Sequence, residues 1–176
     1  MIEELKRKIA HYLIRKKYLR KSEESIAFKS IIRDAKEILL IMPGNDADFI
    51  EALESVKYFQ NHKKTISIFI AEAKHSTLQL TSSVKLISYL PLQITRFFLP
   101  DKMLLARLKD KKYDVVIDLN LKENTFFSCV ANVVNSKIRI GFRKNRSEDY
   151  YNIIYDSKQN EPLLVYKKLI EHLAMF

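Results

Sequence analysis

The stretch EILLIM at residues 37–42, followed at once by PGND at residues 43–46, is the strongest indication of fold class in this chain. A short uninterrupted apolar run is typical of a strand that is buried on both faces, and the turn-forming cluster ends it. Residues 46–59 then place apolar side chains at helical spacing, and Asp46 is expected to cap that helix. A buried strand, a turn and a helix in this order predict the start of a β-α-β unit.

The same alternation continues along the rest of the chain. It predicts a mostly parallel, doubly wound sheet flanked by helices, in a single Rossmann-like α/β domain over residues 22–176. Residues 1–21 are expected to form a basic amphipathic helical appendage. Further strands are predicted at 65–70, 84–89, 96–99, 113–119, 137–141 and 150–155, and helices at 22–33, 101–110, 123–134 and 163–175, with a weak helix or loop at 72–81.

Composition narrows the class of protein. The chain has one cysteine, so no intramolecular disulfide is possible, and Cys129 in its apolar run is expected to be a buried side chain rather than a nucleophile. The four histidines are scattered without ligand spacing, so neither a metal nor a cofactor is expected. The chain shows no secretory signal and no apolar stretch near the ~20 residues of a membrane span. We expect a cytoplasmic protein, with peripheral attachment at the inner membrane as an alternative.

Positive charge is concentrated near the N-terminus. The formal net charge is +10, and residues 1–21 hold eight Lys/Arg against two Glu. Within the predicted helix over residues 2–20, Ile2, Leu5, Ile9 and Leu13 form one apolar stripe, which is expected to pack on the domain. The alternatives are a helix lying on anionic lipid and a basic arm on nucleic acid. The basic side chains of this helix are Lys6, Arg7, Lys8, Arg15, Lys16 and Lys17.

A second group of cations follows the strand at residues 137–141. Tyr150 and Tyr151 come soon after it, so the segment is a candidate for phosphate binding and base stacking. The simpler alternative is a solvated loop. Together the two basic groups predict a protein partner or an anionic one, either nucleic acid or an acidic lipid surface. The cations of this second group are Arg139, Arg143, Lys144 and Arg146.

Three segments carry a resemblance to a known family. They are ILLIMPGNDADFIEALESV at 38–56, YDVVIDL at 113–119 and SKIRIGF at 136–142. In order and spacing they resemble the N-terminal, acceptor-side half of heptosyltransferase-type glycosyltransferases, the bacterial enzymes that add heptose to the lipopolysaccharide core. The resemblance covers residues 36–176. The chain departs from the family in having Ala47 where Gly is usual, and in ending where the family has its second, donor-binding domain.

The resemblance implies a role for Asp48, because the matching family residue is the proposed base that deprotonates an acceptor hydroxyl. Asn45, Asp46 and Asp118 would share the crevice at the carboxyl ends of the strands, where open α/β sheets bind ligands. The competing explanation is that Asp46 and Asp48 only cap helix amides.

Three functions remain open from the sequence. We expect a non-catalytic, glycosyltransferase-like binding or interaction module with a basic surface. One alternative is the acceptor-binding part of a glycosyltransferase that needs a separate donor-binding chain. The other is a nucleic-acid-associated or membrane-peripheral protein.

Overall fold

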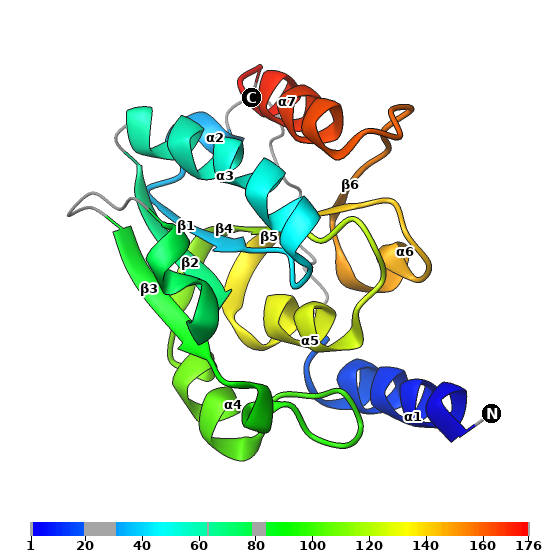
Figure 1. Ribbon diagram of the computed structural model, residues 1–176. Coiled ribbons are helices and arrows are strands. Elements are labelled where there is room, and N and C mark those ends of the chain that lie inside the picture. Colours follow the sequence, from blue (N-terminus) through cyan, green and yellow to red (C-terminus); the bar gives the residue numbers. More distant parts are fainter. Residues whose placement is uncertain (1, 20–30, 63, 79–83, 176) are drawn as a thin grey trace.

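A single parallel sheet organises the part of the chain that the structure, a computed structural model, describes, which is residues 2–19, 31–62, 64–78 and 84–175. Its six strands run in the order β3-β2-β1-β4-β5-β6, and every neighbouring pair is parallel (Figure 1). This confirms the predicted α/β fold with a Rossmann-like sheet. The strands are β1 (Glu37–Ile41), β2 (Thr65–Ala71), β3 (Val84–Tyr89), β4 (Lys112–Asp118), β5 (Asn135–Phe142) and β6 (Ile153–Tyr155).

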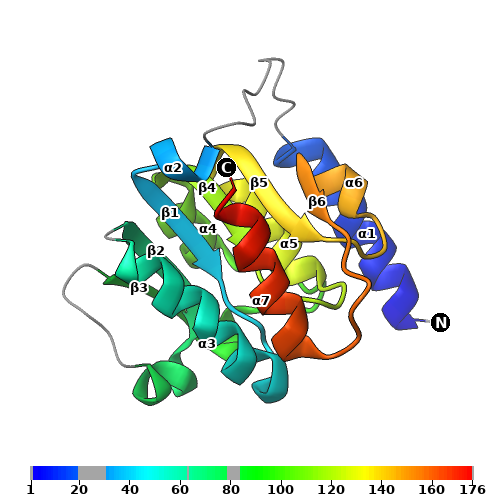
Figure 2. The same cartoon turned by 90° about the horizontal axis from the view of Figure 1, so that it is seen from above.

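Helices cover both faces of the sheet. Figures 1 and 2 show α2, α3 and α7 over one face and α1, α4 and α5 over the other. None of the described helices is long and apolar enough to cross a membrane. The helices are α1 (Ile2–Lys17), α2 (Ile31–Asp34), α3 (Asp46–Asn61), α4 (Lys102–Lys109), α5 (Thr125–Val133), α6 (Ser147–Tyr150) and α7 (Pro162–Leu173), with short 3-10 turns at η2 (Glu72–Thr77) and η3 (Pro91–Gln93).

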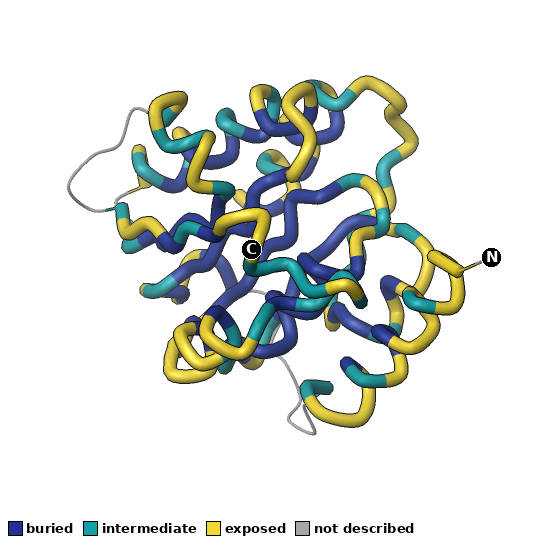
Figure 3. The backbone as a smooth tube through the Cα atoms, turned by 60° about the horizontal axis from the view of Figure 1, so that its bottom comes forward, coloured by how far each residue is buried: buried dark blue, intermediate teal, exposed yellow. Residues whose placement is uncertain are grey.

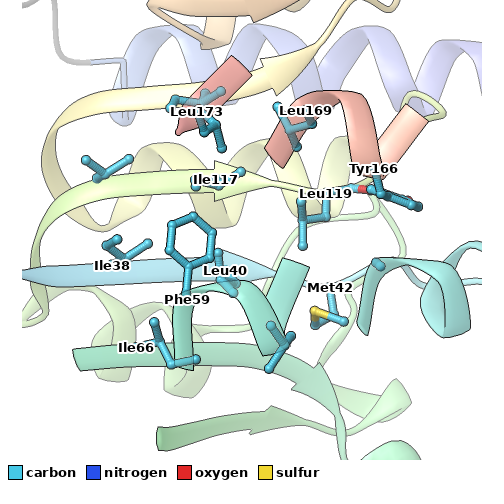
Figure 4. Packing of buried hydrophobic residues seen from close by; sticks show 14 of the residues in the cluster. Ile38, Leu40, Met42, Phe59, Ile66, Ile117, Leu119, Tyr166, Leu169 and Leu173 are labelled. Atoms are coloured by element: carbon cyan, nitrogen blue, oxygen red, sulfur yellow. The ribbon is translucent and has the colours of Figure 1, made fainter. Parts of the chain in front are cut away.

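The central strand β1 is buried on both faces of the sheet. Ile38 and Leu40 point toward α3 and α7, whereas Leu39 and Ile41 point toward α4 and α5, and all four are fully buried. Alternation along a strand sends successive side chains to opposite faces, so a strand with two covered faces must be apolar at every position. Figure 4 shows the hydrophobic core on the side of α3 and α7, where Phe59 and Leu169 pack over the strand residues.

The helix α1 packs on the domain, but through a different face from the one expected. Ala10, His11 and Ile14 are buried, and the helix contacts α5. Ile2 and Leu5 of the predicted inward stripe are instead 70% and 59% exposed. The prediction that this stripe packs on the domain was therefore wrong, although the helix itself does dock. Figure 3 shows the exposed outer side of this helix beside the N-terminus.

The segment expected to form an edge strand at residues 96–99 is a tight turn instead. The backbone N–H of Thr95 donates to the carbonyl of Leu99 at 2.8 Å, and Phe98 adopts a positive φ of 57°. The chain therefore reverses here and cannot extend along the sheet.

The bounds of other predicted elements differ less from those in the structure. The predicted strand at 150–155 is shortened to β6, because residues 147–150 form α6. Of the predicted helix at 22–33, only the last residues appear, in α2, and the rest lies outside the described residues. The same holds for the end of the predicted segment at 72–81.

Candidate functional site

The turn between β1 and α3 holds two of the predicted site residues against each other. The side-chain oxygen of Asn45 accepts a hydrogen bond from the backbone N–H of Asp48 at 2.8 Å, which makes Asn45 the N-cap of α3. The amide nitrogen of Asn45 donates in return to Asp48 Oδ2 at 2.7 Å. Asp48 is buried, at 8% exposure. One of its carboxylate oxygens is therefore engaged in holding the first turn of the helix.

Asp46 does not cap this helix, contrary to the prediction. Its side chain is 91% exposed and forms an ion pair with Lys74 at 2.9 Å. Lys74 also donates to the carbonyl of Gly44 at 2.9 Å and lies over the ring of Phe49, 4.5 Å from its centroid. Asp46 thus contributes a surface ion pair at the start of α3, whereas Asn45 is the N-cap residue.

At the end of β4, Asp118 is fully buried and surrounded by donors. Its Oδ1 accepts from the backbone and side-chain nitrogens of Asn120, at 3.0 and 2.7 Å. Its Oδ2 accepts from Lys144 Nζ at 2.7 Å and from the Tyr151 hydroxyl. Burial raises the pKa of Tyr151 well above its ordinary value, and the negative charge of Asp118 raises it further, so the phenol stays protonated and remains a donor.

Lys144 and Tyr151 both donate to the second oxygen of Asp118, Oδ2. The Lys144 side chain is only 5% exposed, donates to the Asn120 carbonyl at 2.9 Å, and lies 5.1 Å from the centroid of the Tyr151 ring. A Cβ atom on Gly141 would come within 2.8 Å of that ring, so the ring can pack there only because residue 141 is glycine. We call Asp118, Asn120, Lys144 and Tyr151 the buried polar network.

The buried polar network ties three loops together at the carboxyl ends of the strands. Asn120 Oδ1 accepts from the backbone N–H of Gly44 at 3.2 Å, which links the loop after β4 to the loop after β1. Lys144 brings in the loop after β5. A buried carboxylate whose oxygens are all engaged by donors is stable as a structural anion and has no free lone pair directed at a ligand. Asp118 therefore serves to hold the three loops together.

A polar groove lies beside this network, and Asp48 is on its wall. The groove has a volume of about 400 Å³ and is also lined by Lys122, Arg143, Asp156 and Asn160. We call it the carboxyl-edge groove. Arg143 is half exposed and is held by Asp156 at 2.7 Å and Glu148 at 3.1 Å. Its guanidinium is therefore already shared between two carboxylates at the rim.

Arg139 does not line the carboxyl-edge groove. It is 2% exposed, and its guanidinium donates to the carbonyls of Ala131 at 2.8 Å and Val134 at 3.3 Å, at the end of α5. A cation at the C-terminal end of a helix satisfies carbonyls that have no partner within the helix. The structure thus places this residue in the support of α5 rather than at a surface.

The two basic segments of the sequence meet in a second groove. Lys8, Tyr12, Arg15 and Lys16 of α1 face Arg146 of the loop before α6 across a depression of about 560 Å³, with His11 at its base. We call it the basic groove. Arg146 adopts a left-handed conformation with a φ of 59°, and its nearest acidic partner, Asp149, is 3.8 Å away. Arg7 is turned elsewhere, with its guanidinium 5.8 Å from the centre of the Phe98 ring.

His11 anchors the wall of the basic groove to the domain. It is 4% exposed, is hydrogen-bonded to the Tyr150 hydroxyl through Nδ1, and contacts Glu123 Oε1 at 2.9 Å through Nε2. Burial lowers the pKa of His11 and the positive charge of Arg146 lowers it further, while Glu123 opposes both. The imidazole therefore connects α1 to α6 and to the loop before α5.

Several of these residues were not recognised in the sequence, or were assigned the wrong surroundings. Base stacking on Tyr150 and Tyr151 was one candidate role for their segment, but the two residues are 3% and 6% exposed, so their rings are not accessible to a base. Asn120 and His11 were not proposed as site residues at all. The spacing of Asp118 and Asn120 at a strand end was the signal for Asn120, whereas nothing local marks His11. Within the described ranges, no group of three or more His, Cys, Asp or Glu side chains could hold a metal ion.

Comparison with known proteins places the chain in a family. The model of the family described as "Family of unknown function (DUF6913)" matches residues 6–176. The chain belongs to this family. The match begins within α1 and includes most of this helix. A search of curated proteins gave no match.

The fold of this DUF6913 chain is similar to that of a solved structure. It is similar to the E. coli heptosyltransferase WaaC with ADP, with a TM-score of 0.55 and 15% sequence identity. The similarity covers 77% of this chain and 46% of the heptosyltransferase chain. It confirms the resemblance to one half of a heptosyltransferase, and at this identity it concerns the fold alone.

Proposed function

We propose that this DUF6913 chain is a non-catalytic binding module with a glycosyltransferase-like fold, which takes an anionic partner on its basic surface. The observation that carries the proposal is the basic groove. It joins cations from two distant segments, Lys8, Arg15 and Lys16 of α1 and Arg146 before α6, around one open depression. Like charges repel when they are brought together, so a shared anion would stabilise the arrangement.

The state of the carboxylates supports the non-catalytic part of the proposal. A general base must reach the proton that it removes, either directly or through one water molecule. Asp118 is fully buried and is occupied by Lys144, Tyr151 and Asn120. Asp48 is nearly buried and already accepts a hydrogen bond from the Asn45 amide. Asp118 is therefore closed to a substrate, and one oxygen of Asp48 is committed to the first turn of α3.

Elution from a phosphate-bearing cation exchanger tests where the anion binds. Lys8→Gln, Arg15→Gln and Lys16→Gln are combined in one variant. The control variant combines Lys102→Gln, Lys111→Gln and Lys112→Gln, which removes the same charge from exposed positions on α4, just before β4 and at the start of β4. Weaker retention of the groove variant than of the control supports the proposal. Equal retention of the two variants would mean that only net charge matters, and would refute the basic groove as the site.

A second candidate function rests on the carboxyl-edge groove. Asp48 lies on its wall beside polar side chains, and this is the place where open α/β sheets bind ligands. By the resemblance, the groove would be the acceptor side of a glycosyltransferase that works with a separate donor-binding chain. Amide chemical-shift mapping with a panel of hexoses and heptoses tests this candidate. A specific shift around Asp48 that Asp48→Asn abolishes would favour it over the binding module.

A further inference from the structure

The outward face of α1 is apolar, which is unusual for a helix that packs on a soluble domain. Ile2, Leu5, Ile9 and Tyr12 are 70%, 59%, 37% and 61% exposed. Their spacing of three, four and three residues places them on one side of the helix. We call them the apolar stripe. The helix buries Ala10, His11 and Ile14 instead, so a histidine faces the core while the four side chains of the apolar stripe remain accessible to solvent.

Cations lie along both sides of the apolar stripe. At about 100° per residue, Lys8 and Arg15 fall on one side of it and Lys6 and Lys17 on the other. Lys8 and Arg15 also line the basic groove, so Arg146 adds its charge on that side. An exposed apolar strip bordered by cations along its length is the pattern of a helix that lies in the interface of an anionic bilayer.

We propose that α1 docks this protein on an anionic phospholipid membrane surface. The apolar stripe enters the boundary between headgroups and acyl chains, and the basic groove lies at the level of the lipid phosphates. This inference rests on the proposed function, since it names the anionic partner as a lipid surface. Its area of contact is the face of α1 that the domain leaves uncovered.

The composition of the surface selects this partner over two others. A second copy of the chain would bring two basic helices together, and the net charge of +10 opposes that. A nucleic acid would meet the cations, but its phosphates would gain nothing from Ile2, Leu5 and Ile9 at the centre of the face. Anionic lipid complements both the charges and the aliphatic side chains.

The absence of tryptophan from the chain allows a direct test on the full-length protein. A single tryptophan introduced as Leu5→Trp would report the environment of the stripe. The control is Met103→Trp, at a position on α4 that is 73% exposed. With phosphatidylglycerol-containing vesicles, we expect a blue shift of the Leu5→Trp emission and none for Met103→Trp. Vesicles of phosphatidylcholine alone should shift neither variant.

A second pair of variants separates insertion from charge. Ile2→Ser with Leu5→Ser should weaken partition onto the anionic vesicles by about tenfold or more, because two aliphatic side chains are lost from the interface. Leu92→Ser with Met103→Ser removes two exposed apolar side chains from elsewhere and should leave partition unchanged. All four positions are exposed, so both variants should keep the thermal midpoint of the parent protein.

Three results would overturn the inference. They are an unshifted Leu5→Trp spectrum with anionic vesicles, equal partition of the two serine variants, and a spectrum that shifts with a single-stranded oligonucleotide and not with vesicles. If the groove variant still loses retention on the phosphate exchanger while the vesicle tests fail, the anionic site stands and the lipid assignment fails. If vesicles bind but the groove variant is retained like its control, the proposed role of the basic groove fails instead.

Discussion

The ion pair between Asp118 and Lys144 is the residue-scale feature with the largest expected effect on stability. Lys144→Met would leave Asp118 buried and without its cation, which typically costs about 3–5 kcal/mol. Combining it with Asp118→Asn should cost less than the sum of the two single changes, because the uncompensated charge is then gone. Urea unfolding of the three variants measures both quantities.

The control for that experiment is the exposed pair at the rim of the carboxyl-edge groove. Arg143→Gln removes a half-exposed guanidinium, and exposed ion pairs contribute about 1 kcal/mol or less. A Lys144→Met protein as stable as the Arg143→Gln protein would contradict the description of Asp118 as a buried, dependent carboxylate.

Asp48 is expected to behave as a helix-capping partner. Asp48→Asn keeps an oxygen beside Asn45 that can accept a hydrogen bond, so the free energy of unfolding should change by about 1 kcal/mol or less. Retention on the phosphate exchanger should not decrease, because the change removes a negative charge and leaves the basic groove intact. Thermal unfolding and the elution profile check the two halves of this prediction. Loss of binding in a folded Asp48→Asn protein would show that the carboxylate contacts the partner.

At the scale of elements, the orientation of α1 makes a prediction that separates its two faces. Ile14 is fully buried, so Ile14→Ala should cost about 2–5 kcal/mol, as deletions from well-packed cores do. Leu5 is exposed, so Leu5→Ala should change stability by about 0.5 kcal/mol or less. Chemical denaturation of the two variants measures the difference. The reverse order of effects would mean that the helix docks through its apolar stripe after all.

The docking of α1 should also depend on pH through His11. Its pKa is lowered from an ordinary value of 6.5, so the folded protein favours the neutral imidazole that contacts Tyr150 and Glu123. Below that ordinary value the unfolded chain binds the proton more readily than the folded one, and stability falls. The contribution of His11 is thus complete above about pH 6.5 and is lost as the pH decreases toward the lowered pKa.

Comparison with a variant that cannot titrate isolates this effect. Thermal unfolding of the parent protein and of His11→Gln between neutral and mildly acidic pH should show a steeper decline for the parent. Parallel curves for the two proteins would assign the pH dependence to other groups.

At the scale of the whole molecule, the sheet could be predicted from the sequence and the facing of α1 could not. Strands such as β1 and β4 are continuous apolar runs because both faces of the sheet are covered, and that pattern is local. Periodicity shows that Ile2, Leu5 and Ile9 share a face, but which face meets the domain depends on contacts with α5 and α6, far away in sequence.

The candidate site was predictable to a similar extent. Asp118 was proposed from its position at the end of a strand and Lys144 as one of a group of cations, yet their pairing across 26 residues was not visible in the sequence. The cations of the basic groove were predicted as members of two separate basic groups. Because α1 and Arg146 are far apart in the sequence, their proximity in the fold could not be predicted. Residue types suggested the chemistry, and only the fold brought the partners together.

Docking of α1 on anionic lipid is tested most directly by amide chemical-shift mapping of the full chain with a soluble, short-chain phosphatidylglycerol. We predict that perturbations concentrate in α1 and around Arg146, at the apolar stripe and the basic groove. Perturbations confined to the carboxyl-edge groove, around Asp48 and Asn160, would contradict it and would favour an acceptor-binding role for this surface.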